Sequence, residues 1–88
     1  MISKNYVINA PEGIHARPAA TLIRLAKKYK SVVRMKKDEK LVLLNSMLNL
    51  LTIGAKGGDT ITVTIEGEDE AYAAEAIDNF FSEELNKL

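Results

Sequence analysis

The sequence predicts an α+β domain in which three helices cover one face of a four-stranded antiparallel sheet, in the order βαββαβα. Three observations support this fold. A chain of 88 residues is long enough for one domain with a small core, spanning residues 1–88. Residues 60–66 alternate between apolar and hydroxyl side chains, which is typical of a strand with one exposed face. Apolar residues recur at helical spacing in residues 19–26 and 74–85.

The four predicted strands differ in the strength of their patterns. Residues 60–66 are the clearest, because they are rich in β-branched side chains. Residues 6–8, 32–36 and 40–44 are shorter candidates. The polar segment 37–40 lies between two of them and indicates a hairpin turn.

Each predicted helix has a recognisable boundary. Pro18 fits the first turn of the first helix, where a missing N–H costs little. A short apolar helix follows Ser46, which is a good N-cap, and ends at Gly54. Acidic residues 68–70 precede the last helix, where the positive end of the helix dipole stabilises them.

The composition excludes several classes of protein. The chain has no Cys and one His, which argues against disulfide scaffolds, thiol catalysis and metal clusters, so we expect neither a metal nor a cofactor. No apolar run has the length that a membrane span needs, and residues 1–10 lack a signal-peptide pattern. We therefore expect a cytoplasmic protein that does not insert into the membrane.

The net charge of zero hides an uneven distribution of charge. Residues 17–40 contain nine of the 12 cations and two anions, a local balance of 9 − 2 = +7. Residues 59–84 contain nine of the 12 anions and no Lys or Arg. The basic half fits an acidic protein surface, a phosphate or a nucleic acid, and the charge alone does not choose among them.

The side chains best suited to chemistry lie in residues 12–20, EGIHARPAA. Gly13 permits a tight turn, and Pro18 places His15 at the start of a helix. There the free N–H groups and the helix dipole favour an anion attached to the imidazole, and Arg17 is close enough in sequence to bind the same anion. These features suit a phosphohistidine, although a lone His at a helix start is more often a surface residue or a cap.

The residues Gly13-Ile14-His15-Ala16-Arg17-Pro18-Ala19 resemble the active-site motif of the HPr family, the histidine-containing phosphocarriers of the sugar phosphotransferase system. The resemblance extends over the whole chain. Ser46 before a short apolar helix, and the segment GAKGGD at 54–59 before the last strand, are also similar to that family. The resemblance implies the open-faced β-sandwich of HPr proteins.

The resemblance also implies a function. HPr proteins accept a phosphoryl group from phosphorylated enzyme I, which phosphoenolpyruvate charges, and pass it to enzyme IIA domains of sugar transporters. The matching acceptor is Nδ1 of His15, and Arg17 matches the Arg that neutralises the phosphoryl charge, with the backbone N–H groups of Ala16 and Arg17 as further donors. Such a protein is a carrier whose chemistry its partners complete rather than an independent enzyme, and we expect a monomer.

The first two helices of HPr proteins dock their partners. The matching apolar residues are Ala20, Ile23, Met47, Leu48 and Leu51, and the matching cations are Arg24 and Lys27. The short helix is too narrow to bury all of its apolar residues at once. We predict that Leu50 and Ile53 are core and that some of the other apolar residues stay exposed.

Ser46 has two interpretations. As an N-cap it stabilises the short helix by about 0.5 to 2 kcal/mol. The resemblance implies a second role, because in many bacteria this Ser is phosphorylated by an HPr kinase/phosphorylase, and the product signals through a catabolite-control regulator. Asn45 and Asn49 depart from the residues expected beside Ser46, which weakens the regulatory interpretation.

Two alternatives stay open. One is an HPr-like regulatory phosphocarrier of the nitrogen-related branch of the system. The other is a non-covalent regulatory or nucleic-acid-binding α+β module. Tyr6 is the only aromatic residue in any predicted strand, and one aromatic does not make a base-stacking platform, so we expect no nucleic-acid partner.

Overall fold

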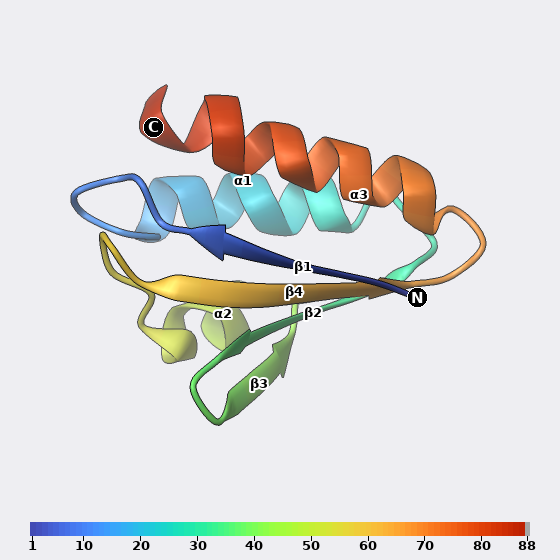
Figure 1. The fold of residues 1–88 in the computed structure, drawn as a ribbon, viewed down its shortest axis with the longest axis horizontal. Coiled ribbons are helices and arrows are strands. Elements are labelled where there is room, and N and C mark those ends of the chain that lie inside the picture. Colours follow the sequence, from blue (N-terminus) through green and yellow to red (C-terminus); the bar gives the residue numbers. More distant parts are fainter. Residues whose placement is uncertain (88) are drawn as a thin grey trace.

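The computed structural model describes residues 1–87 and has the predicted element order, with four strands in one antiparallel sheet (Figure 1). The strands are β1 (Ile2–Val7), β2 (Val32–Lys37), β3 (Lys40–Leu43) and β4 (Thr60–Glu66). Their order across the sheet is β1-β4-β2-β3, so β1 and β3 are the edge strands. Lys37 pairs with Lys40 across the predicted hairpin turn.

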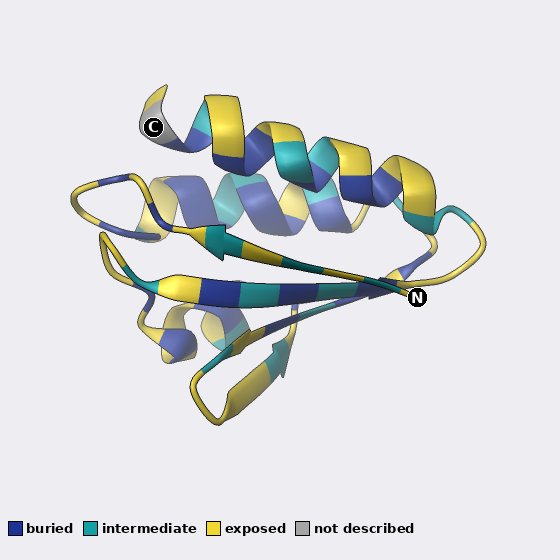
Figure 2. Ribbon diagram, viewed as in Figure 1, coloured by how far each residue is buried: buried dark blue, intermediate teal, exposed yellow. Residues whose placement is uncertain are grey.

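The helices are α1 (Ala16–Ala26), α2 (Met47–Ile53) and α3 (Glu70–Asn79). They cover one face of the sheet, which confirms the predicted open-faced sandwich. On β4, Ile61, Val63 and Ile65 face the helices and are buried, while Thr62 and Thr64 face the other side (Figure 2). The core therefore lies between the apolar face of the sheet and the apolar stripes of the three helices.

The helix starts and ends agree with the sequence patterns. Pro18 lies in the first turn of α1 and is buried. The Ser46 side chain accepts a hydrogen bond from the Asn49 N–H at 3.1 Å, so it caps α2 as predicted. Gly54 ends α2 in the left-handed conformation with φ of 67°.

Two elements differ from the predictions by more than one residue at a boundary. The first strand runs over Ile2–Val7 rather than residues 6–8, because Ile2 and Lys4 pair with Ile65 and Val63 of β4, and short sequence patterns do not reveal such pairing. The last helix is not one continuous α-helix to Leu85. After α3 the chain forms a π-helix (Phe80–Glu84) and a 3-10 turn (Leu85–Lys87).

The π-helix begins with two consecutive aromatic residues whose rings lie in the core. Phe80 and Phe81 are both buried and pack edge to face, with ring centroids 5.1 Å apart. Phe81 also stacks on Tyr6 of β1 at 4.4 Å.

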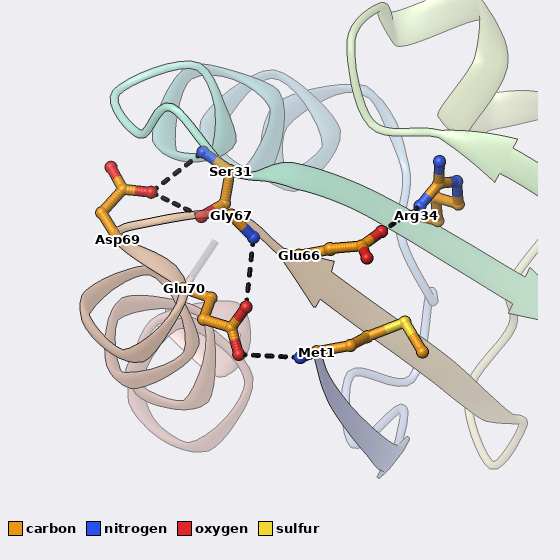
Figure 3. Close-up of polar contacts among 7 residues, drawn as sticks. All are labelled: Met1, Ser31, Arg34, Glu66, Gly67, Asp69 and Glu70. Atoms are coloured by element: carbon orange, nitrogen blue, oxygen red, sulfur yellow. Dashed lines mark hydrogen bonds and ion pairs between the residues drawn. The ribbon is translucent and has the colours of Figure 1, made fainter.

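A polar cluster holds the end of the molecule where α3 begins (Figure 3). Asp69 accepts hydrogen bonds from the Lys30 N–H at 2.8 Å, the Ser31 N–H at 2.9 Å and the Ser31 hydroxyl. Glu70 accepts from the Gly67 N–H at 3.1 Å and pairs with the Met1 amine at 3.0 Å. We call these residues the Ser31–Asp69 cluster, and it ties the start of α3 to β1 and to the start of β2.

Hydrogen bonds within this cluster favour the ionised carboxylates. The Ser31 hydroxyl, followed by the Lys30 N–H, lowers the pKa of Asp69. The Gly67 N–H, followed by the Met1 amine, lowers the pKa of Glu70. The cluster is therefore formed by charged carboxylates, and it serves the fold because all of these oxygens are bound within the chain.

Candidate functional site

His15 is the N-cap residue of α1, at the other end of the molecule from the Ser31–Asp69 cluster. Its backbone is extended, and its carbonyl accepts the Ala19 N–H at 2.9 Å. Its side chain makes no capping hydrogen bond and is 39% exposed. The imidazole is therefore presented to solvent at a helix start without being used to hold that helix.

Unpaired backbone donors surround this position. In residues 1–87, the N–H groups of Ala16 and Arg17 form no hydrogen bond with another group of the protein. They belong to the first turn of α1, where a helix offers no internal acceptor. Two of the predicted phosphoryl-binding donors thus stand free beside His15.

Arg17 is exposed on the same turn of α1. Across the described part of the chain, no carboxylate lies within ion-pair distance of its guanidinium. A free guanidinium that follows the N-cap by two residues is available to an anion bound at the helix start. The two side chains that the sequence predicts for the site thus belong to the same helix start, two residues apart in the chain.

The loop before His15 is held by backbone contacts. The Gly13 N–H donates to the Ala10 carbonyl at 2.9 Å, and the Ile14 N–H donates to the Ala55 carbonyl at 3.1 Å. Gly13 has φ of +71°, and a Cβ there would lie 2.3 Å from the Ala55 oxygen. Only glycine fits this close approach, so the turn that aims His15 depends on it.

The turn at residues 54–59 is hydrogen-bonded to Ile8, just before that loop. The Ile8 N–H donates to the Asp59 carbonyl, and the Gly58 N–H donates to the Ile8 carbonyl, both at 2.8 Å.

Lys37 binds the Gly54 carbonyl at 3.1 Å and the Asp59 carboxylate at 2.8 Å. The Lys37 ammonium, followed by the Lys56 N–H, lowers the pKa of Asp59. The sequence indicated a turn here, but it did not show that Lys37 of β2 supports the site.

Glu12 is a site residue that the sequence analysis did not single out. Its Oε2 lies 3.3 Å from Nε2 of His15. The spacing of three residues across a tight turn is the only sequence signal of this contact. The imidazole therefore has a carboxylate next to its Nε2.

The predicted docking residues fall into two groups. Arg24, Lys27, Leu48 and Leu51 are exposed, while Ala20 and Met47 are partly exposed. Leu48 is 75% exposed, and α1 packs against α2, so these side chains belong to neighbouring helices. They give α2 an exposed apolar surface and α1 an exposed basic surface, which extends from Arg17 near His15 to Lys27 at the other end of the helix.

Ile23 does not lie on that surface. It was expected to be an apolar contact for partners, but it is only 6% exposed and packs in the core. Its place on the buried stripe of α1, between Leu22 and Ala26, explains the difference. Leu50 and Ile53 of α2 are buried, as predicted.

The described residues offer no obvious place for a metal, since no group of three or more His, Asp or Glu side chains among them could hold one. None of the helices described is long and apolar enough to cross a membrane. The site is thus an exposed imidazole with free donors, beside a mixed apolar and basic surface.

Comparison with known proteins points to one family. Residues 2–83 match the family model described as the PTS HPr component phosphorylation site. The chain is 38% identical over 74 residues to phosphocarrier protein HPr of Borreliella burgdorferi, covering 84% of this chain and 86% of that protein. It is 35% identical over 83 residues to phosphocarrier protein HPr of Lysinibacillus sphaericus, covering 94% of each. The crystal structure of HPr-C-His from Thermoanaerobacter tengcongensis superposes with a TM-score of 0.92 at 30% identity, covering 100% of this chain and 98% of that one.

Proposed function

The chain belongs to the HPr family of phosphocarrier proteins of the phosphotransferase system, and from this premise we propose that His15 accepts a phosphoryl group from phosphorylated enzyme I and passes it to enzyme IIA domains. One observation carries the proposal. His15 caps α1 with its backbone alone, so its imidazole is free for chemistry beside unpaired N–H groups. The donor phosphoryl group derives from phosphoenolpyruvate, and we place the protein in the cytoplasm with its partners.

The transfer moves one phosphoryl group between two imidazoles. Nδ1 of His15 forms a bond to phosphorus while the bond from phosphorus to the donor nitrogen breaks, and the donor nitrogen keeps that electron pair. In this proposal the N–H groups of Ala16 and Arg17 and the Arg17 guanidinium bind the phosphoryl oxygens, which is supported by their location at the start of α1. The protein needs no base of its own if Nδ1 carries no proton, so alignment and charge stabilisation are its main contributions.

The partners dock on the surface beside His15. We assign the apolar contacts to Ala20, Met47, Leu48 and Leu51, and the ionic ones to Arg24 and Lys27. An apolar centre with a charged rim is the usual composition of a transient interface. The cations steer an acidic partner toward the imidazole and make the association rate sensitive to salt.

Ser46 is a candidate for regulatory phosphorylation by an HPr kinase/phosphorylase. Its hydroxyl is partly exposed at the start of α2, beside Met47 and Leu48 of the docking surface. A phosphate there would place negative charge where an acidic partner docks and would weaken recognition by enzyme I. The same phosphate would offer a catabolite-control regulator a distinct surface to bind.

The test of the phosphocarrier function is labelling. The protein is incubated with enzyme I, Mg²⁺ and phosphoenolpyruvate, and an acid-labile phosphate is sought on His15 by mass spectrometry at neutral pH. We expect stoichiometric labelling of the native protein and none of His15→Ala. No label from an enzyme I that phosphorylates another HPr protein, or equal label on His15→Ala, would overturn the proposal.

A charge reversal tests the docking surface. Arg24→Glu combined with Lys27→Glu should slow phosphorylation and flatten its dependence on salt. The matched control is Lys36→Glu combined with Lys40→Glu, which changes the net charge equally on exposed residues of β2 and β3. Equal rates for the two double variants would contradict the assignment.

A further inference from the structure

The Glu12 carboxylate lies next to one of the two ring nitrogens of His15. Oε2 of Glu12 lies 3.3 Å from Nε2 of His15, slightly farther than an ordinary N–H···O hydrogen bond. No other side chain among residues 1–87 forms a hydrogen bond or an ion pair with this imidazole. Glu12 is therefore the one side chain in place to influence which ring nitrogen holds the proton.

The backbone restricts how Glu12 and His15 face each other. Gly13 and Ile14, which separate them, are both buried, and both of their N–H groups are hydrogen-bonded. Gly13 is in the left-handed conformation and closes the turn that begins at Ala10 and contains Glu12. This turn keeps the carboxylate close to Nε2, although 80% of the Glu12 side chain is exposed.

We propose that Glu12 is a positioning residue that accepts the Nε2 proton of His15 in a hydrogen bond, so that the lone pair of the neutral ring is on Nδ1. This inference rests on the proposed function, in which Nδ1 receives the phosphoryl group. A neutral imidazole has one N–H and one lone pair, and the partner of one nitrogen selects the state of the other. Holding the proton on Nε2 makes Nδ1 ready to attack.

Glu12 also faces the charge that develops during the transfer. As Nδ1 gives its electron pair to phosphorus, positive charge spreads over the ring, and the proton stays on Nε2. The carboxylate of Glu12 stabilises that charge from one side of the ring, while the phosphoryl oxygens meet Arg17 and the helix start on the other. Because Glu12 is exposed, solvent screens this effect, and we expect a several-fold change in rate rather than a complete loss.

The decisive experiment observes the two ring nitrogens directly in the unphosphorylated protein. Nitrogen-15 NMR of the imidazole is recorded for the native protein, Glu12→Ala, Glu12→Gln and the control Glu39→Gln. Glu39 lies in the exposed turn between β2 and β3, so its substitution removes one negative charge away from the site. In the alkaline range where the ring is neutral, the nitrogen shifts report which tautomer is present.

We expect Glu12→Ala to shift the ring toward the Nδ1–H form and to remove the hydrogen-bond signature at Nε2. Glu12→Gln retains an acceptor oxygen and should give an intermediate spectrum, while Glu39→Gln should match the native protein. Identical nitrogen shifts for Glu12→Ala and the native protein would overturn the proposal. This readout needs no partner, so it stands apart from the test of the phosphocarrier function.

Kinetics with enzyme I then separate positioning from electrostatic repulsion. Loss of positioning should lower kcat about two- to fivefold in Glu12→Ala, with a smaller decrease in Glu12→Gln. Removing a carboxylate that merely repels an acidic partner would instead lower KM and leave kcat unchanged, and this outcome would refute the positioning role. If the native protein accepts no phosphoryl group, the proposed function fails while the NMR result still decides the contact.

Discussion

The chain enters α1 and α3 through segments of opposite character at opposite ends of the molecule (Figure 1). Before α3, Asp69 and Glu70 direct their carboxylates at donors of the chain itself (Figure 3). At the start of α1, His15 caps the helix with its backbone carbonyl alone, its imidazole lies near Glu12 only, and Arg17 has no ionic partner among residues 1–87. One helix start has its polar groups satisfied and the other leaves them available.

The difference shows how a small domain separates stability from function. At the α3 end, side-chain hydrogen bonds connect distant segments, such as Ser31 and Asp69, and hold the fold. At the α1 end, backbone hydrogen bonds of residues 10–14 and 54–59 do this work together with the Lys37 side chain, and none of these contacts uses the side chain of His15 or Arg17.

The largest effect is expected at Gly13, where the site depends on backbone geometry. Gly13→Ala should lower the free energy of unfolding by about 3 kcal/mol, because it combines a strained φ with a clash against the Ala55 oxygen. The measurement is urea unfolding. The control is Gly58→Ala, which has φ of +89° but no atom within 4 Å of the added Cβ, and should lose about 1 kcal/mol. Equal losses would contradict the role of the close approach.

A smaller loss is expected from a side chain at the α3 end. Ser31→Ala removes a buried hydroxyl that donates to Asp69, and should lower the free energy of unfolding by about 1 to 2 kcal/mol. The control Ser82→Ala removes an exposed hydroxyl and should change stability by less than about 0.5 kcal/mol. Labelling of His15 should be unchanged in both variants, and a loss of labelling in Ser31→Ala would show that the two ends are not separate.

The sequence predicts the local features of both ends better than their contacts. The pattern of β4, the Ser46 cap and the location of His15 at a helix start all follow from residues close together in the chain, and the structure confirms them. The hydrogen bonds of Ser31 with Asp69, and of Lys37 with Gly54, join residues far apart in sequence. Periodicity and capping rules describe neighbours along the chain and do not report such pairs.

Two misjudged features also depend on packing. Ile23 appeared to be part of the docking surface, but the rotation of α1 against the sheet buries it. The π-helix after α3 accompanies the stacking of Phe81 on Tyr6, which belongs to the first strand. The motif around His15 can be recognised in the sequence because its residues are consecutive. The contact of Glu12 with His15 follows only from the distance between their side chains in the structure.

The response to acid should distinguish the carboxylate at the α3 end. Hydrogen bonds lower the folded-state pKa of Asp69 below its unfolded value of ~3.9, so its contribution is complete above that value and is lost as the pH falls through the folded pKa. Asp69→Asn should be less stable than the native protein at pH 6, and the difference in their free energies of unfolding should decrease below about pH 4. Urea unfolding at a series of pH values measures it. A gap that stays constant with pH would show that ionised Asp69 does not hold this end.

The smallest effect on stability is expected at His15, and it gives the sharpest comparison between helix starts. Ser46 caps α2 through its side chain, so Ser46→Ala should lower the free energy of unfolding by about 1 kcal/mol. His15 caps α1 without a side-chain bond, so His15→Ala should change it by less than about 0.5 kcal/mol, measured in the same urea series. A loss at His15 as large as that at Ser46 would mean that the imidazole serves the fold after all. If His15→Ala is instead stable and accepts no phosphate, then chemistry alone accounts for the imidazole at this helix start.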